Sequence, residues 1–164
     1  MRFQGLLYRA LNPVWAREPL SGEGARRHGG RFNPRGMPAL YAAQSVMTAI
    51  REANQVGTLQ PTTLVAYRAD LDPVFDGTDP AALAAVGATP ALLAADDWRL
   101  RMQRDGKAPT QALAERLAAA GYVGVQVRSF APGAGAGDLN LVLWTWGDRA
   151  PARLQLVDDE GRLG

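Results

Sequence analysis

The chain has 164 residues, the size of one domain. Hydrophobic residues make up 47% of it and charged residues 21%, which favours a globular core over wholesale disorder. There is no cysteine and a single histidine, His28, so disulfides, thiolate zinc sites, multi-histidine metal sites and a cysteine nucleophile are excluded. A Ser-His-Asp triad would have to use His28, and no orienting acid is evident near it. We therefore interpret it as a solvated loop histidine.

The formal net charge is only +2, and Lys107 is the only lysine among 18 basic residues. Arginine holds phosphates and carboxylates in a planar fork, although an arginine-rich composition explains most of these residues equally well. No basic run with interleaved aromatics is present, so direct nucleic-acid binding is not expected. No apolar run reaches the roughly 20 residues that cross a bilayer, and residues 1–7 do not suit a signal peptide. We expect a cytoplasmic protein with no membrane partner.

The first quarter of the chain predicts two short strands around a long loop. The strands are expected over residues 5–9 and 40–42. Between them, residues 17–38 are rich in glycine, arginine and proline and have no apolar period. Structureless segments of this length are uncommon in compact domains and are often functional.

A helix and a strand are expected next. Ser45 is a suitable N-cap for a helix that runs to about Gln55, with Gly57 as its stop. The predicted apolar face of this helix is Val46, Ala49, Ile50 and Ala53. Residues 62–71 alternate as a strand does, and the side chains expected on one side are Val65, Tyr67, Ala69 and Leu71.

The second half of the chain predicts two helices and three strands. The helices are expected over residues 90–102 and 110–120. The strands are expected over 122–128, 139–146 and, as an edge strand, 153–157. Trp144 and Trp146 would share one face of their strand, where core packing is the preferred role and a stacking platform is the alternative. Strands and helices are mixed without a regular βαβ alternation, so we expect an α+β fold, mostly antiparallel.

The glycine-rich segment 132–138 follows a predicted strand, as a dinucleotide-binding loop does. Such a loop must lead into a helix whose N-terminus holds the pyrophosphate. Here the next segment is predicted to be a strand. We interpret the segment as a flexible surface loop or lid.

Three motifs in the long loop carry a resemblance to a known family. Residues 21–25 read Ser-Gly-Glu-Gly-Ala, residues 29–34 read Gly-Gly-Arg-Phe-Asn-Pro, and residues 38–41 read Pro-Ala-Leu-Tyr. A helix with a glutamate follows, then a serine after a strand and an asparagine in the next strand. This ordered set resembles the RES-domain family, whose members are commonly the toxins of bacterial toxin–antitoxin pairs. The set consists of Arg31, Tyr41, Glu52, Ser129 and Asn140.

The resemblance covers nearly the whole chain and implies a single RES domain over residues 1–164. It implies a fold similar to ADP-ribosyltransferase toxins, with a split, mostly antiparallel sheet and a cleft for NAD⁺ as substrate, and no metal. It also implies an Xre-like antitoxin protein as partner, which we expect to block the NAD⁺ cleft. Some members degrade NAD⁺, and others transfer ADP-ribose to a protein.

We prefer transfer of ADP-ribose to a cellular protein acceptor, because residues 109–130 look like a distinct subgroup of the family. A mono-ADP-ribosyltransferase toxin is therefore the first hypothesis. NAD⁺ glycohydrolase or phosphorylase activity is the near alternative. A non-catalytic binding module on the same fold is the remote one.

Glu52, Arg31 and Tyr41 are the catalytic candidates. Breaking the nicotinamide–ribose bond develops positive charge on the sugar, which a carboxylate can stabilise. Helical geometry places Glu52 beside Ser45 and Thr48, at the edge of the apolar face. A solvated surface glutamate is the alternative. Arg31 can hold the diphosphate bidentately or form a hydrogen bond to the ribose. The alternative is a loop arginine that stacks on Phe32.

The other candidates are expected to help bind NAD⁺. Tyr41 can stack on nicotinamide, or it is a half-buried core tyrosine. Ser129 can bond the nicotinamide ribose or carboxamide, or it is a strand-end serine bonding its own backbone. Gly30 would let the backbone approach the ligand closely. Asn140 would support the serine loop, and Arg9 would add a second phosphate contact.

Overall fold

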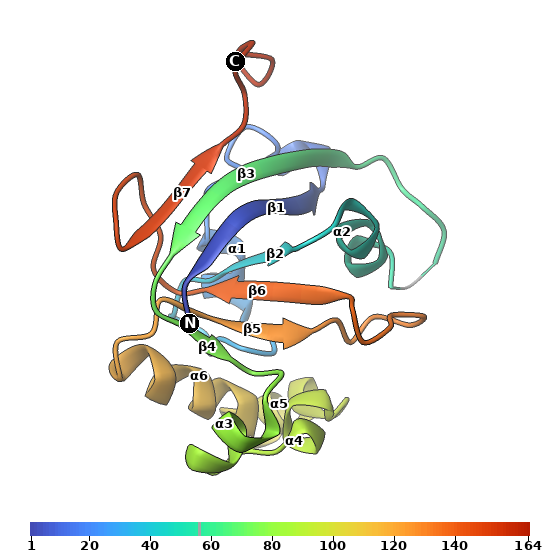
Figure 1. The fold of residues 1–164 in the computed structure, drawn as a ribbon. Coiled ribbons are helices and arrows are strands. Elements are labelled where there is room, and N and C mark those ends of the chain that lie inside the picture. The colour runs from blue at the N-terminus through green and yellow to red at the C-terminus, as the bar shows by residue number, and fades with distance from the viewer. Residues whose placement is uncertain (56) are drawn as a thin grey trace.

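The structure, a computed structural model, describes residues 1–55 and 57–164. Its centre is a seven-stranded, strongly curled sheet with the strand order β4-β5-β6-β2-β1-β3-β7 (Figure 1). The β4–β5 pair is parallel, and the other pairs are antiparallel. The strands are β1 Phe3–Leu11, β2 Leu40–Ala43, β3 Thr63–Leu71, β4 Val74–Asp76, β5 Gly124–Arg128, β6 Leu139–Leu143 and β7 Ala152–Leu156. The predicted α+β, mostly antiparallel fold is confirmed.

The sheet nearly parts in its middle. Strand β1 pairs with β3 along its whole length, from Phe3 opposite Leu71 to Leu11 opposite Thr63. Between β1 and β2, in contrast, Tyr8 and Ala43 are the one pair of register partners. The sheet therefore divides into a β1-β3-β7 part and a β4-β5-β6-β2 part, and the two splay apart beyond this contact.

The helices take up two positions on the sheet. Helix α2 packs on β1 and β2, over the place where the sheet parts. Helices α3 to α6 cover the β4–β5 end, at the bottom of Figure 1. The helices are the 3-10 turn η1 Pro13–Trp15, α1 Glu23–His28, α2 Val46–Ala53, α3 Pro80–Ala85, α4 Pro90–Ala94, α5 Trp98–Asp105 and α6 Pro109–Ala119. No helix of the described residues is long and apolar enough to cross a membrane.

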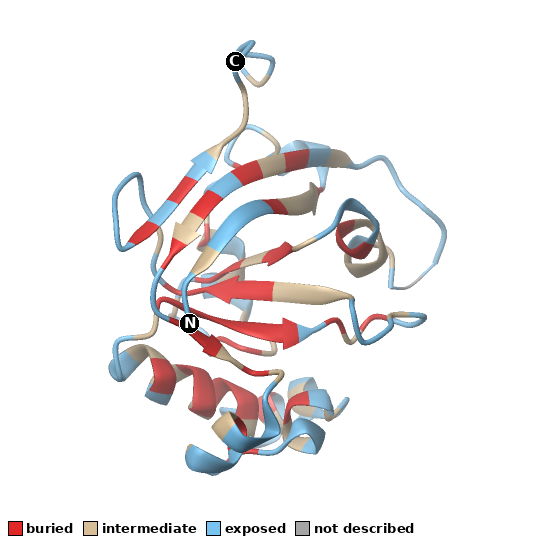
Figure 2. Ribbon diagram, viewed as in Figure 1, coloured by how far each residue is buried: buried red, intermediate tan, exposed pale blue. Residues whose placement is uncertain are grey.

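Two hydrophobic clusters form the core, one on each face of the sheet. Strand β6 serves both, because Leu141 and Leu143 belong to the first cluster and Val142 to the second. The first cluster also holds the predicted apolar side of β3, including the fully buried Tyr67. The second joins β5 to α3, α4 and α6, and the buried residues follow these elements in Figure 2. Strand β5 is thus covered on both faces.

Three expectations about the elements are wrong. The segment 17–38 is not irregular throughout, because it contains helix α1. The helix predicted over 90–102 is two helices, since Ala95 adopts an extended conformation and α5 begins only at Trp98. The strand predicted over 139–146 ends at Leu143. Trp144 and Trp146 consequently do not share a strand face, and their indole N–H groups donate to the carbonyls of Phe32 and Leu20.

The predicted apolar face of α2 is also wrong in part. Val46 and Ala53 are exposed, whereas Thr48 and Ala49 are buried. The helix therefore turns a partly polar side to the sheet, where Thr48 meets Asp138 and Glu52 meets Asn140. His28 is exposed as expected, but it lies at the end of α1 rather than in a loop.

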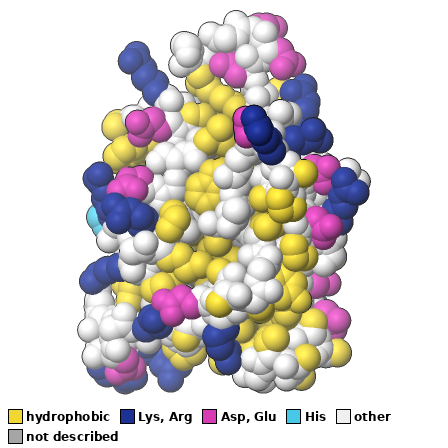
Figure 3. Space-filling model, turned by 90° about the vertical axis from the view of Figure 1, so that its left-hand side faces the viewer, with side chains coloured by type: hydrophobic (Ala, Val, Ile, Leu, Met, Phe, Trp, Pro, Cys, Tyr) yellow, Lys and Arg dark blue, Asp and Glu magenta, His cyan; other side chains and the backbone are white. Residues whose placement is uncertain are grey.

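Figure 3 shows the face that lies on the left in Figure 1. Hydrophobic side chains run down its middle, and basic and acidic side chains are interspersed along its margins. The pattern agrees with the small net charge of +2. It differs from the one-signed basic stripe typical of nucleic-acid-binding surfaces.

Candidate functional site

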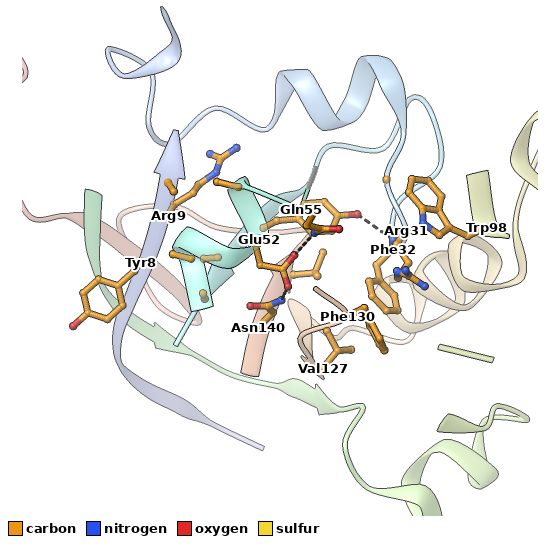
Figure 4. A pocket seen from close by; sticks show the side chains of 18 of the residues that line it. Tyr8, Arg9, Arg31, Phe32, Glu52, Gln55, Trp98, Val127, Phe130 and Asn140 are labelled. Atoms are coloured by element: carbon orange, nitrogen blue, oxygen red, sulfur yellow. Dashed lines mark hydrogen bonds between the residues drawn. The ribbon is translucent and has the colours of Figure 1, made fainter. Parts of the chain in front are cut away.

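A cavity of about 570 Å³ lies where β1 and β2 part. Strands β1, β2 and β6 and helix α2 line it, together with the loop after α1 and the segment that joins α4 to α5. Its volume falls within the roughly 300–1,000 Å³ that is typical of small-molecule and cofactor sites. Figure 4 shows Glu52 near the middle of the cavity, with Arg9 and Arg31 on opposite sides of it. We call this cavity the cleft.

The Glu52 carboxylate is held by three side chains. Its Oε1 accepts a hydrogen bond from the Ser129 hydroxyl and one from Asn140 Nδ2 at 2.6 Å. Its Oε2 accepts from Gln55 Nε2 at 2.7 Å, and Gln55 lies just after the end of α2. Asn140 Oδ1 is buried and has no hydrogen-bond partner within the described part of the chain. The anchors come from the segment after α2, from β6 and from the residue after β5, so residues far apart in the sequence fix the carboxylate.

A polar network places helix α2 over the part of the sheet where β1 and β2 separate. Ser45 caps the helix, as predicted, and its hydroxyl accepts from the Thr48 amide at 3.1 Å. The buried Thr48 hydroxyl donates to Asp138 at 2.8 Å, and Arg51 lies 3.2 Å from the same carboxylate. The backbone N–H of Gly135, the Thr48 hydroxyl and the Arg51 charge together lower the pKa of Asp138. Glu52, four residues after Thr48, therefore faces the strands.

Arg31 is fixed on the opposite wall of the cleft. Its Nη1 donates to the carbonyls of Leu93 at 3.0 Å and Ala95 at 2.7 Å, and its guanidinium lies 4.5 Å from the centre of the Phe130 ring. The Arg31 side chain is only 15% exposed, and burial lowers its pKa. Asp96 and Glu52 oppose that lowering through their negative charge. The carbonyls occupy Nη1, and Nη2 lies 3.8 Å from the exposed carboxylate of Asp96, which a ligand anion could replace.

The loop that carries Arg31 is held by Tyr41. The Tyr41 hydroxyl accepts from the Phe32 amide at 3.0 Å and donates to Asn33 Oδ1 at 2.6 Å. Burial raises the pKa of this phenol above its ordinary value. Gly30 and Asn33 exchange backbone hydrogen bonds at 2.9 and 3.3 Å, which closes the turn that displays Arg31. A Cβ on Gly30 would overlap the Tyr41 hydroxyl and lie 2.7 Å from Asn33 Oδ1, so the turn requires glycine there.

A buried glutamine secures the same turn from below. Gln111 of α6 is fully buried, and its Nε2 donates to the carbonyls of Gly30 at 2.9 Å and Asn33 at 3.1 Å. Its Oε1 accepts from the Ala108 amide at 2.8 Å, at the start of the helix. Both backbone carbonyls of the turn are thus tied to the helical layer.

The structure therefore arranges the predicted site residues in two groups. Glu52, Ser129 and Asn140 form the first, and Arg31, Gly30 and Tyr41 form the second on the facing wall. Arg9 belongs to neither. It lies at the margin of the cleft, and its guanidinium is directed to the Pro19 carbonyl at 3.4 Å.

Sequence reasoning missed several residues of the site, namely Gln55, Trp98, Phe130 and Gln111. Gln55 lies three residues after Glu52, and that spacing within the helix predicted to run to Gln55 was a usable signal. Nothing in the sequence marks the others, because long-range packing brings them to the cleft.

An α+β fold with a cleft at a parted sheet, and with an anchored carboxylate facing a buried arginine, defines a candidate enzyme for an anionic ligand. The chain belongs to the RES domain family, whose model matches residues 6–164. This finding confirms the resemblance read from the loop motifs.

Individual relatives agree with the family. Proteins named NAD(+) phosphorylase MbcT, from Mycobacterium tuberculosis and Mycobacterium bovis, are 40% identical over 94 residues, which is 50% of this chain and 50% of each relative. The chain spans about half the length of these curated relatives. A crystal structure of the M. tuberculosis MbcT–MbcA toxin–antitoxin complex matches 96% of this chain and 84% of its own, with a TM-score of 0.68 and 29% identity.

Proposed function

We propose that this chain is a toxin that degrades NAD⁺ by breaking the bond between nicotinamide and ribose. The observation that carries the proposal is the Glu52 carboxylate, which Ser129, Asn140 and Gln55 hold at the cleft. The name of the phosphorylase relatives supports degradation. That name favours NAD⁺ glycohydrolase or phosphorylase activity over transfer of ADP-ribose to a protein.

The anchored carboxylate suits the electronic demand of this cleavage. As the bond between the nicotinamide nitrogen and the anomeric carbon of its ribose lengthens, the ribose gains oxocarbenium character and the pyridinium becomes neutral nicotinamide. A carboxylate that is already oriented stabilises this developing charge without reorganising during the reaction. Arg31, which is desolvated and fixed to two carbonyls, would hold the diphosphate at a set distance from the reacting sugar.

The acceptor that we propose is orthophosphate. One phosphate oxygen forms a bond to the anomeric carbon of the nicotinamide ribose, which is C1″ of the ADP-ribose product. The bond from this carbon to the pyridinium nitrogen breaks, and nicotinamide leaves with the bonding electron pair. The products are nicotinamide and ADP-ribose 1″-phosphate, and the attacking phosphate loses its proton to solvent. With water as acceptor, the same displacement gives ADP-ribose and one proton.

The test uses the purified full chain, free of any antitoxin, with NAD⁺ labelled on the adenylate phosphate. Reactions run in a phosphate-free buffer, with and without added orthophosphate, and with and without a bacterial lysate. Chromatography separates NAD⁺, ADP-ribose and ADP-ribose 1″-phosphate, and a gel shows any labelled protein. The Glu52→Gln variant, which keeps the shape of the side chain, is run in parallel.

We expect ADP-ribose 1″-phosphate to form only when orthophosphate is present, and not with the Glu52→Gln variant. Free ADP-ribose in both buffers would retain NAD⁺ degradation and overturn orthophosphate as the acceptor. A labelled protein band that disappears with Glu52→Gln would establish transfer instead. Loss of NAD⁺ in none of the reactions would overturn the proposed function.

We also propose that a cognate antitoxin protein covers the cleft. The solved relative was crystallised as a toxin–antitoxin complex. Because Glu52 and Arg31 face the same opening, an antitoxin that covers this opening would keep NAD⁺ from both residues. A structure of the complex that leaves the space between Arg31 and Glu52 open would contradict this proposal.

A further inference from the structure

The wall of the cleft beyond Arg31 carries a tryptophan that neither the core nor the anchored carboxylate uses. Trp98 begins helix α5, lines the cleft and is only partly buried. The indole N–H groups of Trp144 and Trp146 donate to backbone carbonyls. The indole N–H of Trp98 has no hydrogen-bond partner among residues 1–55 and 57–164. The side chain is thus neither packed away nor bonded in place.

Arg31 keeps this tryptophan close to the cleft. Its guanidinium holds the carbonyls of Leu93 and Ala95, which end helix α4. Trp98 follows Ala95 by three residues, and three residues span at most about 11 Å. Figure 4 shows Glu52, Arg31 and Trp98 in that order across the site. The exposed Arg99 lies over the indole, with its guanidinium carbon 4.8 Å from the ring centre.

The other aromatic side chains of the cleft are less available for stacking. The guanidinium of Arg31 covers the Phe130 ring, and Phe32 is buried. The Tyr41 hydroxyl is bonded to the Arg31 turn, and Tyr8 points away from Glu52 in Figure 4. Trp98 differs from Phe130 because the guanidinium over its ring belongs to the exposed Arg99, whereas Arg31 is fixed over Phe130 by two carbonyls. A base can therefore replace Arg99 on the indole, or stack on its other face.

The opposite end of the cleft offers no equivalent platform. Beyond Arg9 lies a second hollow between the end of β1, the end of α2 and residues 58–62. Its described lining contains no aromatic residue. A dinucleotide whose reacting sugar lies at Glu52 can therefore find a stacking surface for its second base on the Arg31 side.

We propose that the cleft binds NAD⁺ with its nicotinamide riboside at Glu52, its diphosphate at Arg31 and its adenine stacked on Trp98. This inference rests on the proposed function for the identity of the ligand. It adds a subsite that selects a dinucleotide over a mononucleotide. Stacking of a base on an aromatic side chain contributes about 1–3 kcal/mol, which corresponds to about 5- to 150-fold in affinity, so loss of the indole should weaken dinucleotide binding at least about fivefold.

The test compares two ligand pairs on the purified chain. Turnover of NAD⁺ is compared with that of nicotinamide mononucleotide, which has the reacting bond but no adenosine. Calorimetric binding of ADP-ribose, which lacks the scissile bond, is measured as well. The variants are Trp98→Ala, Trp98→Phe and, as a matched control, Trp15→Ala, because Trp15 is 54% exposed and does not line the cleft.

We expect Trp98→Ala to raise the KM for NAD⁺ and the Kd for ADP-ribose at least about fivefold. The kcat/KM for nicotinamide mononucleotide should stay within about twofold of the parent value, because this ligand has no adenine and loses no contact when Trp98 is removed. Trp98→Phe should recover part of the loss, and Trp15→Ala should show none. A merely structural role of Trp98 would impair both substrates together.

Equal losses for NAD⁺ and nicotinamide mononucleotide, or no loss for ADP-ribose, would overturn the adenine subsite and leave the proposed function standing. The reverse case is also decided by the binding measurement. If neither substrate is turned over but ADP-ribose binds through Trp98, the subsite stands and the proposed function fails. If ADP-ribose does not bind the parent protein, the subsite is wrong.

Discussion

Asn140 Nδ2 lies 2.6 Å from Glu52 Oε1 and ties strand β6 to helix α2 at the floor of the cleft. Ser129 donates to the same oxygen from the residue after β5. Two donors on one carboxylate oxygen leave Glu52 little freedom to rotate, and Gln55 restrains the other oxygen. The carboxylate is therefore preorganised in the free protein rather than on ligand binding.

The Glu52→Gln variant should remove NAD⁺ cleavage while the fold persists. An amide keeps the size of the side chain but cannot balance positive charge on the sugar. Loss of one preorganised electrostatic group typically lowers kcat by about 10²–10³-fold, and we expect a loss of at least that size. Glu18→Gln is the matched control, because Glu18 is exposed and does not line the cleft. The measurement is kcat for NAD⁺ cleavage, made on variants whose melting temperatures match that of the parent. A loss of tenfold or less with Glu52→Gln would contradict the prediction.

The Gly30→Ala variant should destabilise the turn that displays Arg31. The new Cβ would overlap the Tyr41 hydroxyl, and overpacking of this kind costs about 1–3 kcal/mol of unfolding free energy. Gly24→Ala is the control, since no atom of the described residues lies within 4 Å of its Cβ position and alanine favours the helix there. Urea unfolding measures both variants.

A double variant tests the cause of that loss. Tyr41→Phe removes the hydroxyl that the Cβ would meet, so the Gly30→Ala/Tyr41→Phe pair should lose less than the sum of its single changes. Strict additivity of the two losses in unfolding free energy would show that the clash lies elsewhere.

The sequence predicts those parts of the fold that local pattern controls. The alternation of Val65, Tyr67, Ala69 and Leu71 gives β3, and the Ser45 cap gives the start of α2. The ordered motifs of the family predict that Glu52, Ser129 and Asn140 belong to one site. The structure then shows their contacts, which no spacing along the chain could supply.

The missed features depend on partners that are distant in the sequence. The break between α4 and α5 occurs where Arg31 takes the Ala95 carbonyl, 64 residues away, and this break sets Trp98 at the cleft. A glutamine on a helix is usually exposed, yet Gln111 is buried because it bonds carbonyls 78 and 81 residues away. Helix α2 turns Thr48 inward for the same reason, since Asp138 meets it across 90 residues.

The Gln111→Leu variant should weaken both stability and ligand binding. Leucine fills a similar volume but leaves the buried Ala108 amide without its partner, at a cost of about 1–3 kcal/mol. The Gly30 and Asn33 carbonyls each lose one hydrogen bond and keep the one they exchange with each other. The KM for NAD⁺ should rise as the Arg31 turn loosens. Gln103→Leu, on the exposed side of α5, is the control. An unchanged free energy of unfolding in Gln111→Leu would show that the Gly30–Asn33 turn is stable without Gln111.

The Asp138→Asn variant should change how stability depends on pH. Hydrogen bonds from Gly135 and Thr48 and the charge of Arg51 lower the pKa of Asp138 in the folded protein, whereas an unfolded aspartate titrates near pH ~3.9. A lowered folded-state pKa stabilises the protein fully above that pH, and the contribution is lost as the pH falls through the folded-state value. The difference in unfolding free energy between parent and Asp138→Asn should therefore be largest at neutral pH and shrink in acid. Urea unfolding at pH 7 and pH 3 measures it, with Asp148→Asn as an 87% exposed control. A difference that widens in acid would contradict the assignment of the Asp138 carboxylate as the group that joins segment 132–138 to helix α2.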